Sequence, residues 1–189
     1  MSDVKNTSST FETIVKPIIV LTVICVITSA LLAFTNSVTA PIIEAAELAA
    51  AQAAYQEVLP EADGFEDLTA QAPVEGITAV MKATNGAGWC FQAEGKGYGG
   101  AVPVIISVDA EGKILAVKFM QNAESAGFGM KLWDGNAEGV AFADALKGKS
   151  GSVTLKADGV DGITGATISS KAAVSAVNAA LECFAAMNA

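Results

Sequence analysis

The sequence predicts an α+β protein with one N-terminal transmembrane helix followed by a small antiparallel-sheet domain with packed helices. An uncharged apolar run covers residues 17–34 and stays uncharged to residue 43, and a spanning helix needs about 20 mostly apolar residues. Alternating apolar residues and Gly-containing turns between residues 74 and 120 predict antiparallel strands. An Ala-rich stretch at residues 169–187 has the apolar spacing of a helix.

The apolar run at residues 17–38 is interpreted as a retained transmembrane helix. It is longer than the ~7–15 apolar residues of a signal peptide, and the leader before it has 16 residues. Val38–Ala40 vaguely resembles a cleavage site, so a signal peptide is the alternative. Because Lys5 and Lys16 precede the run, the positive-inside rule predicts that residues 1–16 are a cytoplasmic tail and that the chain after the run is extracytoplasmic.

Residues 39–60 are predicted to form a helix that connects the transmembrane segment to the domain. Ala, Glu, Leu and Gln dominate this segment, and Pro60 ends it. Its larger apolar residues lie near one face, which predicts packing on the domain or on a partner. Residues 61–189 are then predicted to be the extracytoplasmic domain.

The domain begins with an acidic, turn-rich segment at residues 60–73 and contains a polar Gly-rich loop at residues 121–130. A shorter helical or irregular part follows that loop. The predicted strands lie at residues 74–84, at 89–94, twice within 101–120, and at 152–156. The two strands within 101–120 are joined by the turn D-A-E-G, which is a hairpin signal.

The composition excludes several functions. There are 20 Asp and Glu against 11 Lys and Arg, for a net charge of −9, and all the basic residues are Lys. Nucleic-acid binding requires a basic footprint, so it is not expected. The absence of His and of paired Cys spacing argues against a metal site. Cys90 and Cys183 could form a disulfide if the domain lies outside the cytosol.

Three Gly-rich loops, at residues 97–100, 124–129 and 161–170, are the candidate binding elements. Gly allows a backbone to approach a flat ligand closely, and the third loop leads into the C-terminal helix, whose N-terminus favours a phosphate. The alternative is that a glycine makes a turn, Ser169 or Ser170 caps the helix, and nothing binds. The residues alone favour this alternative, because Gly with Ser or Thr before a helix is common. Neither a Walker loop nor a dinucleotide fingerprint is present.

The segment D-G-I-T-G-A-T, residues 161–167, resembles the flavinylation motif of the FMN-binding domain family. In that family the last Thr carries FMN through a phosphoester bond, which implies Thr167 here. G-Y-G-G ahead of an apolar strand and E-S-A-G-F-G at residues 124–129, where the family has E-T-P-G-L-G, add to the resemblance. It covers nearly the whole chain from about residue 15 and is strongest to the G subunits of Rnf complexes. The C subunits of Na+-translocating NADH:quinone reductases rank second.

The resemblance implies which residues contact a covalently bound FMN. Besides the covalent attachment residue Thr167, they are Asp161, Thr164, Gly165, Ala166, Tyr98, Gly99, Gly100, Glu124, Ser125, Phe128 and Lys131. Asp161 is implied in recognition by the flavin transferase that makes the bond. Ser125 and Phe128 replace the usual Thr and Leu of the family, with the hydroxyl and the bulk retained. No acid–base constellation is visible and no catalytic residue is assigned, because the flavin carries the redox chemistry.

The implied function is that of an electron-relay subunit in a membrane-bound, ion-translocating ferredoxin:NAD+ oxidoreductase of the Rnf type. Its partners are the other subunits of the complex and, for maturation, the flavin transferase. The implied location is the inner or plasma membrane, with a single span. The chain alone is not expected to catalyse the overall reaction, because it lacks a nicotinamide motif and cluster ligands. The alternatives are the flavin subunit of the NADH:quinone reductase and a non-redox anchored structural subunit.

Overall fold

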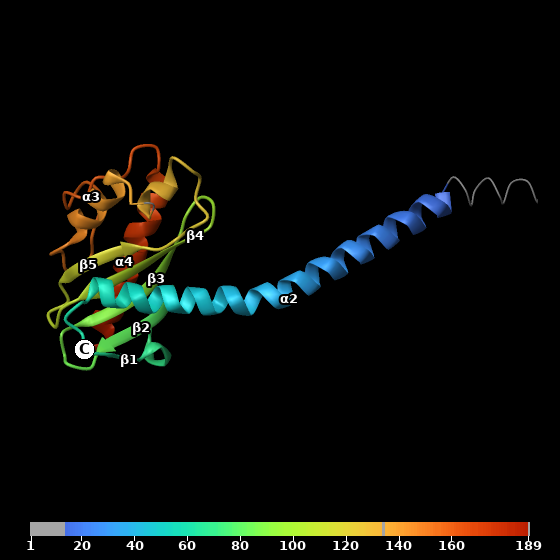
Figure 1. Cartoon of the computed structure of the whole chain (residues 1–189). Coiled ribbons are helices and arrows are strands. Elements are labelled where there is room, and N and C mark those ends of the chain that lie inside the picture. The colour runs from blue at the N-terminus through green and yellow to red at the C-terminus, as the bar shows by residue number, and fades with distance from the viewer. Residues whose placement is uncertain (1–13, 134, 189) are drawn as a thin grey trace, which may run out of the picture. The chain divides into compact units, whose positions relative to one another are not determined.

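The computed structural model describes residues 14–133 and 135–188. The chain divides into two compact units, Met1–Ala50 and Ala51–Ala189. The elements, labelled in Figure 1, are α2 (Lys16–Val58), β1 (Phe65–Asp67), η2 (Thr69–Gln71), β2 (Ile77–Ala83), β3 (Trp89–Lys96), β4 (Ala101–Val108), β5 (Ile114–Phe119), η3 (Gly129–Leu132), α3 (Ala137–Leu146) and α4 (Thr167–Met187). The predicted α+β class is confirmed.

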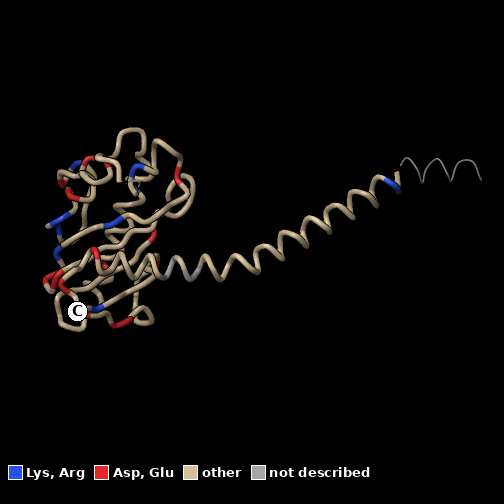
Figure 2. The backbone as a smooth tube through the Cα atoms, viewed as in Figure 1, with Lys and Arg blue, Asp and Glu red and all other residues tan. Residues whose placement is uncertain are grey.

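The first unit contains the N-terminal part of helix α2. Its segment Lys16–Ile43 has 28 residues and contains an 18-residue stretch with a mean hydropathy of 2.7, so by length and composition it could cross a membrane. Figure 2 shows no charged residue along this segment after Lys16. The hydroxyls of Thr22 and Thr28 donate to carbonyls one turn earlier, at 2.8 and 2.9 Å. These bonds leave no unpaired hydroxyl donor at the two positions, as an apolar surrounding requires.

Helix α2 has no break between the predicted transmembrane segment and the predicted connecting helix. It runs continuously from Lys16 to Val58, with Pro41 inside it. Its last residues belong to the second unit, where they pack on the sheet. The segment that was expected to connect two parts therefore supplies part of the core of the domain.

The second unit is built on one antiparallel sheet with the strand order β1-β2-β3-β4-β5. Each strand pairs with its neighbour in the chain. Short turns join β2 to β3, β3 to β4 and β4 to β5, whereas a longer segment that contains η2 joins β1 to β2. In the predicted D-A-E-G turn, the carboxylate of Asp109 accepts hydrogen bonds from the N–H groups of Glu111 and Lys113, at 3.1 and 2.8 Å. Such side-chain bonds to the backbone are why Asp favours turns. The turn places the end of β4 beside the start of β5.

Two strand predictions differ from the structure. The short strand β1 lies in the acidic segment for which only turns were expected. Residues 152–156 do not form a strand, and only Leu155 makes an isolated bridge, to Val160. Backbone N–H groups there donate to side chains instead of to a neighbouring strand. The Val153 N–H donates to Asn178, and the Thr154 N–H donates to Asp158. This local pairing competes with a strand ladder.

The sheet has a helix on each face. Helix α4 packs against β3 and β4, and its predicted apolar stripe is buried: Val174, Val177, Leu181 and Phe184. On the other face, Tyr55, Val58 and Leu59 at the end of α2 pack with Cys90 and Ile105. Fully burying one such large side chain stabilises a fold by roughly 1.5–3 kcal/mol. The loop at residues 97–100 joins β3 to β4 at one end of this packed sheet.

The two buried cysteines, whose pairing the sequence left open, are not paired. Cys90 and Cys183 are both free. Cys90 packs with the end of α2, whereas Cys183 belongs to the cluster on the α4 face. The sheet therefore separates the two thiols. Burial raises the pKa of Cys90 to about 12, which makes this thiol unreactive at neutral pH.

Candidate functional site

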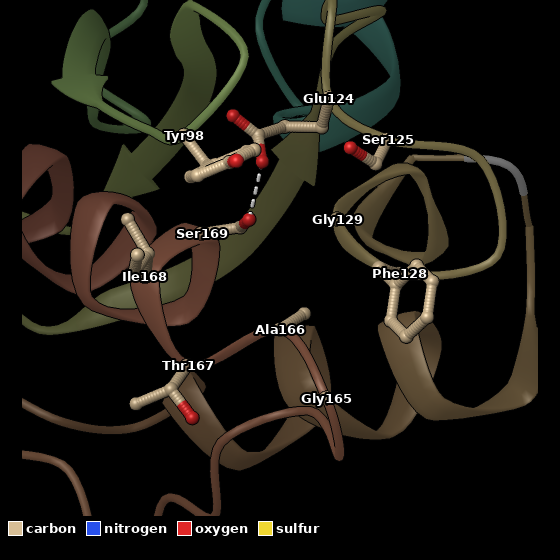
Figure 3. Close-up of a pocket in the computed structure, with 10 residues that line it drawn as sticks. All are labelled: Tyr98, Glu124, Ser125, Phe128, Gly129, Gly165, Ala166, Thr167, Ile168 and Ser169. Carbon is tan, nitrogen blue, oxygen red and sulfur yellow. Dashed lines mark hydrogen bonds between the residues drawn. The ribbon is translucent and has the colours of Figure 1, made fainter.

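A pocket of about 410 Å³ lies where the three Gly-rich loops meet the N-terminus of helix α4. This volume is within the range of roughly 300–1,000 Å³ that is typical of small-molecule sites. The residues that line it, drawn in Figure 3, are Tyr98, Glu124, Ser125, Phe128, Gly129, Gly165, Ala166, Thr167, Ile168 and Ser169. The fold therefore brings together the three segments that the sequence singled out.

Most of the residues named from the sequence line this pocket, but five do not. The backbones of Gly99 and Gly100 instead donate hydrogen bonds to the carboxylate of Glu124. Asp161 and Thr164 are exposed in the loop before α4. Lys131 is directed to Glu138 of helix α3, with Nζ 2.9 Å from Oε1, and so it does not reach the pocket lining.

The start of helix α4 has no side-chain cap. The N-cap is Ala166 and the helix begins at Thr167, so the expectation that Ser169 or Ser170 caps the helix is wrong. Both serines lie inside the first turn and are buried. Ser170 Oγ accepts from the N–H of Ile163 at 3.0 Å. Because no side chain caps the helix, its N-terminus in the pocket remains favourable for an anion.

Glu124 connects the three loops from a buried position, with 5% of its surface exposed. Its Oε2 accepts from Ser169 Oγ at 2.5 Å, the dashed line in Figure 3, and its Oε1 accepts from the N–H of Gly99 at 2.9 Å. Burial by itself raises the pKa of this carboxyl. The hydrogen bonds from Ser169 and from the Gly99, Tyr98 and Gly100 backbones outweigh burial and hold the pKa of Glu124 below its ordinary value.

Sequence reasoning missed Gly129, Ile168 and Ser169 as lining residues. Gly129 directly follows the predicted Phe128, and a Cβ there would lie 2.5 Å from both Glu124 Oε2 and Ser169 Oγ. Only glycine fits that position, and the G-F-G pattern was the available signal. Ser169 gave no signal of its own, because a serine before an apolar helix is also the pattern of a cap.

The wall of the pocket combines open backbone with exposed apolar side chains. Gly165 has a φ of 78°, and a Cβ there would approach the Phe128 ring to 3.0 Å, so glycine is favoured at this turn. The exposed fractions of Tyr98, Phe128 and Ile168 are 76%, 55% and 52%. These surfaces are available to a flat, largely apolar ligand group.

Thr167 is exposed at the first position of α4. Figure 3 shows it beside the Gly165–Ala166 turn, with its side chain directed away from the Glu124–Ser169 pair. Within residues 14–133 and 135–188, no hydrogen bond holds its hydroxyl. The hydroxyl is therefore accessible for chemistry.

The pKa of Glu124 predicts how acid affects stability. Because its folded-state pKa is lowered, the ionised carboxylate stabilises the fold above the unfolded-state pKa of about 4.3, and this stabilisation is lost as pH falls through the folded-state pKa. We expect Glu124→Gln to lower the melting temperature near pH 7, since hydrogen bonds to a charged group contribute about 1.5–3 kcal/mol each. The difference in melting temperature between the variant and the wild type should become smaller at acidic pH. Melting curves at several pH values measure this difference. A difference that does not change with pH contradicts the conclusion that the ionised carboxylate of Glu124 stabilises the fold.

Comparison with known proteins finds matches to two parts of the chain. The FMN-binding domain model matches residues 97–182, and the model of the RnfG N-terminal region matches residues 1–58. The G subunit of the Na+-translocating ferredoxin:NAD+ oxidoreductase complex of Acetobacterium woodii is 29% identical over 184 residues, covering 88% of this chain and 89% of that one. The G subunit of the proton-translocating complex of Clostridium ljungdahlii is 27% identical over 168 residues, covering 86% of each chain.

A solved structure is also similar, that of the C subunit of the Na+-translocating NADH-quinone reductase from Parabacteroides distasonis. It is 24% identical with a TM-score of 0.44, and covers 57% of this chain and 59% of that one. The match to the FMN-binding domain covers β4, β5, η3, α3 and most of α4, and so it includes the loops that line the pocket. Residues 97–182 match the FMN-binding domain, and the chain is similar to the G subunits of Rnf complexes.

Proposed function

We propose that this chain is the electron-relay subunit of an Rnf-type ferredoxin:NAD+ oxidoreductase and carries FMN covalently on Thr167. The observation that carries the proposal is the place of Thr167. It ends the segment D-G-I-T-G-A-T, starts helix α4 and lines the pocket. It also lies within the residues that match the FMN-binding domain.

The residues of the pocket fit FMN. The chain has no Arg, and the uncapped N-terminus of α4 supplies the favourable place for a phosphate. The exposed ring of Phe128 and the open backbone at Gly165 leave room for a flat ring system. When bound, the flavin supplies the electron transfer, and the chain would hold it near the β3–β4 loop and the start of α4.

The accessibility of the loop before α4 suits attachment by a separate flavin transferase. In the proposed step the Thr167 oxygen attacks the FMN phosphorus of FAD, the phosphoester forms, and the bond to the adenylate breaks so that AMP leaves. The hydroxyl proton passes to a base of the transferase. Asp161 and Thr164 are exposed in the same loop and are proposed recognition residues. Lys131 pairs with Glu138 instead.

The apolar segment Lys16–Ile43 and the match to the RnfG N-terminal region support a membrane anchor. In the proposed topology, residues 1–16 are cytoplasmic and the FMN-binding domain lies outside the cytoplasm, because lysines precede the apolar segment. The partners are the other subunits of the Rnf-type complex. The names of the two relatives specify different ions, Na+ and the proton, so no coupling ion is assigned.

The test is to purify the full-length tagged chain from membranes of a host that contains an Rnf-type complex and a flavin transferase. We expect a yellow protein whose flavin fluorescence stays with the chain after denaturation, and we expect Rnf subunits to copurify with it. A colourless chain from such a host contradicts the FMN assignment. A flavin-bearing chain that copurifies with NADH:quinone reductase subunits contradicts the assignment to an Rnf-type complex.

A further inference from the structure

We propose that Glu124 is a positioning residue that lowers the reduction potential of the cofactor in this pocket by keeping a fixed negative charge in the pocket wall. The inference rests on the proposed function, because it needs FMN in the pocket. It differs from the contact role that the family resemblance implies. Glu124 acts here through its charge and through its hydrogen bonds to the loops.

The charge of Glu124 is placed in the pocket lining and shielded from solvent. The residue lines the pocket, yet its side chain is almost completely buried. Within the described parts of the chain, no ion pair includes Glu124. Among residues 14–133 and 135–188, the charge is compensated by hydrogen bonds from neutral groups, which include Ser169 Oγ and the N–H of Gly99. A charge in such a site acts more strongly on its neighbours than a charge in water.

The carboxylate is also held in one orientation. Ser169 Oγ donates to Oε2 and the N–H of Gly99 donates to Oε1. The backbone N–H of Glu124 donates to Asn122 Oδ1 at 3.1 Å. A Cβ at Gly129 would contact the same carboxylate, so the loop lies tightly against it. Both oxygens are thus fixed, and the charge cannot turn away from the pocket.

A fixed negative charge makes it less favourable to add electrons beside it. In the relay, the electrons come from a reduced centre of a partner protein, which is oxidised as FMN is reduced. Each electron that arrives in the pocket adds negative charge near the Glu124 carboxylate. The repulsion is expected to lower the midpoint potential of the cofactor, since charge near a flavin tunes its electronics.

The test compares the midpoint potential of the flavin in the full-length wild-type chain and in Glu124→Gln, in detergent at pH 8. Gln is isosteric with Glu: its oxygen can accept from Gly99 and its NH₂ can donate to Ser169. The variant therefore removes the charge and keeps the shape. We expect a higher midpoint potential than in the wild type. The control is Glu111→Gln in the β4–β5 turn, at the opposite end of β4 from the pocket loops, and its potential should not change.

A second variant, Ser169→Ala, is expected to shift the midpoint potential in the opposite direction. Ser169→Ala keeps the carboxylate and removes one hydrogen bond that compensates it, so the midpoint potential should fall below the wild-type value. Ser169→Ala can also test the inference if Glu124→Gln fails to acquire FMN. An unchanged potential in Glu124→Gln, or shifts of the same sign in both variants, overturns the inference. A wild-type chain without FMN contradicts the proposed function itself, which separates the two failures.

Discussion

Thr167→Ala is expected to abolish covalent FMN attachment completely while the chain stays folded. Thr167 is exposed at the first position of α4, and exposed substitutions usually change stability by about ±0.5 kcal/mol or less. The variant therefore loses the attachment oxygen and little else. Mass spectrometry of the tryptic peptide 157–171 measures the effect. The wild-type peptide should carry the mass of FMN less one water, and the variant peptide should not.

The matched control for this prediction is Thr154→Ala. It removes another exposed threonine hydroxyl, from a residue that does not line the pocket, and it should retain FMN in full. Fragment ions of the wild-type peptide should place the added mass on Thr167 rather than on Thr164. If Thr167→Ala still carries the flavin mass on this peptide, attachment is at another hydroxyl and the proposed site is wrong.

The segments that form the pocket could be predicted, because local sequence patterns determine the glycine turns and the start of the C-terminal helix. The segment D-G-I-T-G-A-T specifies a glycine turn and the start of a helix, and the structure has Gly165 at a positive φ directly before α4. The alternating strands and the D-A-E-G turn likewise set the antiparallel order of the sheet. In such a meander, each tight turn determines the neighbour of the next strand. These features need no knowledge of distant contacts.

The contacts within the site could not be predicted, because they join residues far apart in the chain. The bond between Ser169 and Glu124 spans 45 positions, and it exists only because the first turn of α4 packs against the loop before η3. The sequence therefore suggested a helix cap for the serine, and for the glutamate only a contact with FMN, which the resemblance implies. Lys131 shows the same limit, since its partner Glu138 is determined by the position of α3.

The end of helix α2 shows a different limit. Helix propensity predicted a helix at residues 39–60, and α2 extends through this segment to Val58. Propensity does not indicate which part of a continuous helix the domain buries. In the structure, Tyr55 OH donates to Gln92 at 2.9 Å, and Ser107 Oγ donates to the carbonyl of Val58 at 2.6 Å. Both partners are on the sheet. The last residues of α2 are therefore part of the domain, which begins before residue 61.

This boundary gives the second prediction with a large effect. Removal of residues 1–43 is expected to release a folded chain from the membrane into the aqueous fraction, because the apolar segment ends at Ile43. Removal of residues 1–59 is expected to release a chain that does not fold. It lacks Tyr55, Val58 and Leu59, each of which contributes roughly 1.5–3 kcal/mol by burial, against a typical total stability of about 5–15 kcal/mol. Membrane fractionation and thermal melting measure the two effects.

Two point variants in the chain that starts at residue 44 distinguish the effect of losing buried side chains from the effect of shortening the chain. In a chain that starts at residue 44, Tyr55→Ala should lower the melting temperature strongly, by the equivalent of about 3–5 kcal/mol expected for a buried aromatic side chain. Gln52→Ala, on the exposed side of the same helix, should leave it nearly unchanged. Equal melting temperatures for Tyr55→Ala and Gln52→Ala would show that the end of α2 is not part of the core. A chain that starts at residue 44 and still sediments with membranes would require another anchor. Membrane release and loss of folding are expected to separate because the two parts of α2 differ. The part before residue 44 is the apolar segment, and the part after residue 50 belongs to the core of the domain.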